Sequence, residues 1–111
     1  MEQQLNNLVE RLKKTFGERL ISAVLYGSGA VGDWNAKASD LNILCALEKV
    51  SVQELSESEA VFRWWREQGN PAPLLLSEEE VRNSSDCFPM EFHDIKSHRR
   101  VLYGLDVIAD L

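Results

Sequence analysis

The sequence lacks the features that mark a membrane-spanning, secreted or zinc-binding protein. No stretch reaches the roughly 20 consecutive apolar residues of a membrane helix, and the opening residues MEQQLNNLVERLKK lack the apolar segment of a signal peptide. The chain has only two cysteines, Cys45 and Cys87, and their separation matches no zinc-ligand spacing. We interpret both as buried free thiols and expect a cytoplasmic protein without a membrane segment.

Positive charge is also scarce. The chain has 12 Lys and Arg residues against 18 Asp and Glu, which gives a net charge of −6. Because binding to nucleic-acid phosphates depends mainly on Lys and Arg, this balance argues against broad nucleic-acid binding and leaves only a local basic spot open. The 111 residues suffice for one hydrophobic core. We expect a single domain over 1–111, either complete or the N-terminal part of a longer protein.

Hydrophobic spacing predicts helices that alternate with strands. The first helix is amphipathic and stops at Gly17; its apolar positions are Leu5, Leu8, Val9, Leu12 and Phe16. Strands are expected over Leu20–Tyr26, Asp40–Leu47, Pro73–Leu76 and Pro89–Ile95. Val101–Tyr103 is either a fifth strand or the start of a terminal segment.

Two further helices are expected between these strands. The longer one covers Val52–Gln68, ends at Gly69, and is expected to bury Leu55, Val61, Phe62 and Trp65. Since Trp64 and Trp65 are adjacent, only one of them can face the core squarely. A short helix is expected to begin after Ser77, which acts as its N-cap and precedes three glutamates in the first turn.

The stretch LYGSGAVGDWNAKASDLNIL, from Leu25 to Leu44, interrupts two apolar strands with small and polar residues. Glycine at position 27 allows backbone conformations that other residues resist, and Ser28 can cap a turn of helix. The unpaired N–H groups of such a turn, over Gly27, Ser28 and Gly29, are suited to hold a phosphate without a cationic side chain.

The strand that follows this turn begins with polar residues on alternate positions. Strand geometry places the side chains of Asp40 and Asn42 about 7 Å apart on one face, while Leu41 and Ile43 point to the core. Two oxygen-bearing side chains beside a phosphate-binding turn favour a site where a magnesium ion and a triphosphate meet.

This arrangement resembles the signature of the DNA polymerase β-like nucleotidyltransferase superfamily, in which a Gly-Ser turn precedes Asp-x-Asp or Asp-x-Glu on a strand. The resemblance covers the order of elements over the whole chain, but its motif only over Gly27 to Leu44. It implies an α+β (two-layer) fold, with a mixed sheet of about four to five strands and helices packed on it. The chain is similar to minimal bacterial members, which pair with a separate helical partner protein, whereas larger members carry a C-terminal helical domain.

The resemblance also implies a reaction and its cofactor. Members that react transfer a nucleoside monophosphate from a nucleoside triphosphate such as ATP to a hydroxyl acceptor, and carboxylates hold Mg²⁺ for this step. By this analogy Asp40, Asn42 and a third acid on a later strand are the catalytic and metal-binding residues. Glu91, within FPMEFHDIKSHRRVLYG, is the candidate third acid, and Asp94 replaces it if a bulge reverses the strand phase. The turn at 27–29 then binds the nucleotide.

Two positions depart from the pattern. Asn42 stands where the superfamily has its second acid, and an amide brings no negative charge and cannot bridge two cations, which costs roughly 10²- to 10³-fold in rate. Gly29, Ala30 and Val31 stand where active relatives commonly carry Arg. The function expected is therefore weak or lost nucleotidyl transfer. The alternative is a catalytically inactive nucleotide- or protein-binding module, such as an antitoxin-like partner of a helical protein. The basic run Lys96–Arg100 either meets a triphosphate or an RNA backbone, if it folds over the site, or is a solvated turn.

Overall fold

The computed structural model describes residues 2–26, 41–83 and 99–108, and every structural statement below concerns these residues. Along the chain the elements are α1 (Glu2–Phe16), a 3₁₀ turn η1 (Gly17–Arg19), β1 (Leu20–Tyr26), β2 (Asn42–Leu47), α2 (Val52–Glu67), β3 (Leu74–Ser77), α3 (Glu78–Arg82) and β4 (Arg99–Gly104). No described helix is long and apolar enough to cross a membrane.

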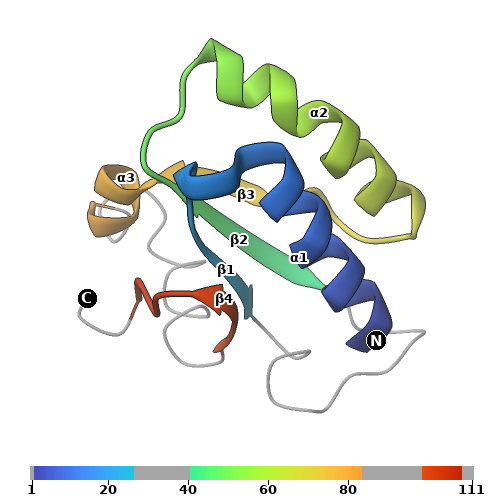
Figure 1. The fold of residues 1–111 in the computed structure, drawn as a ribbon. Coiled ribbons are helices and arrows are strands. Elements are labelled where there is room, and N and C mark those ends of the chain that lie inside the picture. Colours follow the sequence, from blue (N-terminus) through green and yellow to red (C-terminus); the bar gives the residue numbers. More distant parts are fainter. Residues whose placement is uncertain (1, 27–40, 84–98, 109–111) are drawn as a thin grey trace.

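The strands form one mixed sheet in the order β3-β2-β1-β4. β1 pairs antiparallel with both β2 and β4, whereas β2 and β3 run parallel. Figure 1 shows α1 and α2 side by side over one face of the sheet, with α3 apart from them. This arrangement confirms the α+β fold with helices packed on a mixed sheet. The expected strand over Pro89–Ile95 lies outside the described residues.

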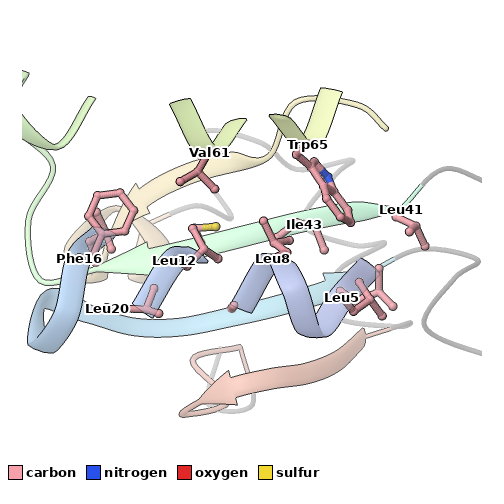
Figure 2. Close-up of a cluster of buried hydrophobic side chains, with 13 residues drawn as sticks. Leu5, Leu8, Leu12, Phe16, Leu20, Leu41, Ile43, Val61 and Trp65 are labelled. Atoms are coloured by element: carbon pink, nitrogen blue, oxygen red, sulfur yellow. The ribbon is translucent and has the colours of Figure 1, made fainter. Parts of the chain in front are cut away.

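The face of the sheet under α1 and α2 carries the larger hydrophobic core. Leu5, Leu8 and Leu12 of α1 are almost fully buried, as are Val61 and Trp65 of α2. Figure 2 shows these side chains converging on Ile43 of β2. The spacing of apolar residues in the first helix therefore predicted its buried face correctly. Cys45, also in this cluster, is a buried free thiol, and burial raises its pKa to about 12.

The opposite face of the sheet is also covered. Val24 of β1 and Leu44 and Ala46 of β2 form a second cluster with Val81 of α3 and Ile108, which follows β4. The alternation expected along β2 is confirmed, since Leu41 and Ile43 are buried in the larger core. Along β2, the side chains on the second face are therefore polar only at Asn42, and apolar at Leu44 and Ala46.

The inward side of α2 differs from the sequence expectation at its first turn. Leu55 is 54% exposed, whereas Glu54 is 2% exposed, so the buried positions are Glu54, Ser58, Val61 and Trp65. Glu54 is buried because it accepts hydrogen bonds from the backbone N–H (2.9 Å) and hydroxyl of Ser51 and from Arg19 (2.8 Å). The expectation that Leu55 would lie in the core was wrong for this reason.

Candidate functional site

Three strands bring one residue each to the same end of the sheet. β1 ends at Tyr26 and β2 begins at Asn42, and these two residues are partners in the antiparallel register. On the other side of β1, Tyr26 is also the partner of Arg99, the first residue of β4. Asn42, Tyr26 and Arg99 therefore form a continuous cross-strand row, which we call the end row. The candidate motif, residues 27–40, connects two of its members in sequence.

The side chains of Tyr26 and Asn42 belong to the face of the sheet away from α1 and α2. Leu25 and Ile43 are partners in the register and are both buried in the larger core. Because successive side chains of a strand alternate, the following pair, Tyr26 and Asn42, points to the opposite face. Both are half-buried, and Tyr26 packs against the second cluster.

Arg99 is held at this end of the sheet by an ion pair. Its Nε donates to Oδ1 of Asp106 at 3.0 Å and to Oδ2 at 3.1 Å. Oδ1 of Asp106 also accepts the backbone N–H of Ile108 at 3.3 Å, so the carboxylate is fixed by the buried end of its own segment. The side chains of Arg99 and Asp106 are 25% and 35% exposed, which leaves the pair accessible to solvent.

Asn42 is the one predicted site residue that the described structure contains. Gly27, Ser28, Gly29, Asp40, Glu91 and its alternative Asp94 lie outside the described residues. Among the described residues, no group of three or more His, Cys, Asp or Glu side chains could hold a metal ion. An asparagine side chain offers only one neutral oxygen, so Asn42 alone does not supply the negative charge that a Mg²⁺ site needs.

The structure places two residues beside Asn42 that the sequence motif does not contain. Tyr26 was predicted only as the last residue of a strand, and Arg99 only as one member of the basic run Lys96–Arg100, for which a triphosphate contact was one of the interpretations. The signal that links them to Asn42 is strand register, because β4 pairs with β1 across more than 70 positions of sequence. Such long-range pairing is not encoded in any local pattern.

A separate hollow of about 400 Å³ lies on the second face of the sheet, near the start of β1. Its walls come from α3, from the start of β1 and from the segment after β4: Ile21, Glu78, Val81, Arg82, Leu105, Asp106 and Val107. Ile21 is at the opposite end of β1 from Tyr26, so this hollow is distinct from the end row. Asp106 is the residue that touches both, since it lines the hollow and binds Arg99.

No protein-family model and no curated protein sequence matches the chain. Solved structures do match. A spectinomycin adenyltransferase, AAD(9), from Enterococcus faecialis with ATP and spectinomycin has a TM-score of 0.68 at 14% identity. This match covers 96% of the present chain and 58% of that enzyme, so the chain spans less than two thirds of its length.

Chains of toxin–antitoxin complexes match as well. One complex contains AMP-PNP; its match has a TM-score of 0.55 at 15% identity and covers 90% of this chain and 73% of that one. Another is a tri-AMPylated HEPN toxin with MNT antitoxin from Shewanella oneidensis, with a TM-score of 0.56 at 15% identity and coverage of 95% of this chain and 74% of that one. At these identities the likeness concerns the fold alone. The chain has a nucleotidyltransferase-like fold.

Proposed function

We propose that this chain is a nucleotidyltransferase-like domain that binds a nucleoside triphosphate, ATP above others, at the end row. Its transfer of a nucleoside monophosphate to a hydroxyl acceptor is weakened or lost. The observation that carries this proposal is the position of Asn42, at the start of β2 and beside the end of β1. The residues between these strands, 27–40, contain the Gly-Ser turn and Asp40.

The proposed roles follow the chemistry of the residue types. Backbone N–H groups over Gly27, Ser28 and Gly29 bind phosphate oxygens. Asp40 and Glu91, with Asn42 as a neutral third ligand, hold Mg²⁺. When bound, this ion offsets the charge that develops on the phosphoryl oxygens. A nucleoside triphosphate substrate also fits the cytoplasmic location expected from the sequence.

The weakness of transfer follows from Asn42. A carboxylate at this position would add a full negative charge close to the metal, and the amide replaces it with a dipole. Removal of one such electrostatic contribution typically lowers turnover by roughly 10²- to 10³-fold. Binding of the nucleotide depends less on this position, because several phosphate contacts come from the turn. We therefore expect the chain to keep its affinity for the nucleotide even where its turnover is lost.

The solved neighbours support ATP as the nucleotide and two kinds of acceptor. One neighbour is an adenyltransferase with ATP and spectinomycin, a small molecule, and another is a complex whose toxin is AMPylated. An acceptor hydroxyl on a small molecule or on a protein partner is consistent with both.

A catalytically inactive binding module is the second candidate, and one observation favours it. The described part of the site contributes an amide, a phenol and a guanidinium, and so brings no carboxylate except Asp106, which is already paired with Arg99. Neighbours that come from toxin–antitoxin complexes support a protein partner for such a module, and the resemblance predicts that this partner is helical.

Calorimetry with ATP and Mg²⁺ tests the proposal, followed by an assay of pyrophosphate release with spectinomycin as a probe acceptor. The variants are Asn42→Asp and, as the matched control, Asn7→Asp, which makes the same change at an exposed position of α1 on the other face. We expect the wild type to bind ATP and Asn42→Asp alone to raise turnover by roughly 10²- to 10³-fold.

The outcomes separate the two candidates. If the wild type, Asn42→Asp and Asn7→Asp all bind ATP but none of them releases pyrophosphate above a reaction without protein, the binding module is supported. If none of the three binds ATP, the assignment of a nucleotide site to this end of the sheet is wrong.

A further inference from the structure

The side chain of Arg99 lies on the same face of the sheet as Asn42. Its neighbour Arg100 is the register partner of Leu25, which faces the larger core, and Arg100 binds Glu2 of α1 on that side. Alternation then places Arg99 on the opposite face, as does its ion pair with Asp106. Asp106 is followed by Val107 and Ile108, which pack in the second cluster.

This position supplies a charge that the sequence motif lacks. The residues after the Gly-Ser pair, Gly29, Ala30 and Val31, are all uncharged. A guanidinium strongly stabilises a bound triphosphate, because its planar N–H donors match the geometry of phosphate oxygens. Arg99 brings this group to the end row from a strand more than 50 residues after Asn42 in the chain.

We propose that Arg99 binds a phosphate of the nucleotide and that Asp106 competes with this phosphate for the guanidinium; this rests on the function proposed above. Asp106 pairs with the guanidinium when no nucleotide is present, and the phosphate displaces it when the nucleotide binds. The exposure of both side chains, 25% and 35%, allows an anion to reach the pair. Arg99 thus replaces, from β4, the arginine that the turn does not carry.

The test compares ATP and adenosine affinity by calorimetry in the presence of Mg²⁺. The variants are Arg99→Gln, Asp106→Asn and the control Arg100→Gln, which removes the adjacent arginine on the other face. We expect Arg99→Gln to weaken ATP binding by about 10- to 100-fold, as for a lost charged hydrogen bond, and to leave adenosine binding unchanged. Arg100→Gln keeps the wild-type affinity for ATP.

Asp106→Asn distinguishes a ligand contact from a structural role. Both Arg99→Gln and Asp106→Asn break the same ion pair, but only the first removes the cation. We expect Asp106→Asn to bind ATP as tightly as the wild type or more tightly, because the competing carboxylate is gone. If Asp106→Asn weakens ATP binding as much as Arg99→Gln does, the proposal is overturned.

Failure of this inference is separate from failure of the proposed function. A wild type that binds ATP, together with an Arg99→Gln variant that binds it equally well, overturns the role of Arg99 alone. A wild type that does not bind ATP overturns both. If Arg99→Gln does not fold, Arg99→Lys keeps the charge without the planar donors. If Arg99→Lys binds ATP measurably but more weakly than the wild type and Arg100→Gln do, the contact is supported. If Arg99→Lys binds ATP as tightly as the wild type, the contact is contradicted.

Discussion

The guanidinium Nη1 of Arg19 lies 2.8 Å from Oε2 of Glu54 and 2.8 Å from Oε1 of Glu57. One cation at the end of η1 therefore fixes two acids in the first turns of α2. Arg19 also donates to the backbone carbonyl oxygens of Thr15 and Phe16. The contact ties the two helices that cover the larger core at the end of the sheet remote from the end row.

Removal of Arg19 is expected to destabilise the fold strongly, because it leaves the buried carboxylate of Glu54 without its cation. In Arg19→Met the free energy of unfolding, measured by urea titration, should fall more than in Glu54→Gln. The double variant should lose less than the sum of the two single losses. Strict additivity would show that the two residues do not interact in solution.

The pH dependence of stability should reflect Glu54. The hydroxyl and backbone N–H of Ser51, with Arg19, lower the pKa of Glu54 from 4.5 to about 2 against the opposing effect of burial. A folded-state pKa below the unfolded one gives a contribution that is fully present above pH 4.5 and is lost as the pH falls towards 2. Arg19 also lowers the pKa of Glu57, so protonation of Glu57 at low pH reduces the stability of the fold in the same direction.

Unfolding measured between pH 7 and pH 2 checks this dependence. Glu54→Gln should flatten the decline of stability with falling pH, because the variant has no proton to bind at this position. Glu67→Gln, an exposed position on the same helix, is the control and should keep the decline. Equal slopes in the wild type and Glu54→Gln would contradict the assignment.

Gly104 is required by both its conformation and its surroundings. Its φ is +78°, and a Cβ at this position would lie 2.0 Å from the backbone oxygen of Ile21. Gly69 has a φ of +90° but has nothing within 4 Å, so it isolates the conformational cost. We expect Gly69→Ala to cost about 1 kcal/mol. Gly104→Ala adds the cost of overpacking and should lose about 2 to 4 kcal/mol. Equal losses in thermal unfolding would mean that β4 shifts away without cost.

The adjacent tryptophans of α2 should respond differently to truncation. Trp65 is fully buried in the larger core, whereas Trp64 is half-buried under the guanidinium of Arg11, whose Cζ is 4.1 Å from the ring centroid. Trp65→Ala should cost about 3 to 5 kcal/mol of unfolding free energy. Trp64→Ala should cost no more than about 2 kcal/mol. A larger loss for Trp64, measured by chemical denaturation, would reverse the assignment of the inward face.

Local patterns in the sequence were sufficient to predict most of the described helices and strands. The strand over Leu20–Tyr26 has the expected bounds, and Ser77 caps α3 through a hydrogen bond from the backbone N–H of Glu80 at 3.0 Å. The third strand is displaced by one residue, to Leu74–Ser77, because Ser77 both ends the strand and caps the helix. The residues expected as a fifth strand or terminal segment lie within β4.

The error at Leu55 has a different origin. Hydrophobic periodicity assumes that apolar side chains define the inward face of a helix, but the first inward residue of α2 is a glutamate. The pattern Ser51-x-x-Glu54 is a capping box, and it could have indicated that Glu54 is held by the helix start. The candidate site shows the same limit, since its motif predicts Asn42, which stays a prediction, whereas only the non-local pairing of β1 with β4 places Arg99 in the same row.

Asn42 stands half-buried at the first position of a strand, outside both hydrophobic clusters. Asparagine and aspartate codons differ by a single base, so one mutation can exchange amide for acid here with little effect on packing. Under the function proposed above, a single base change would therefore exchange the weaker and the fully charged form of the site while the protein continues to fold.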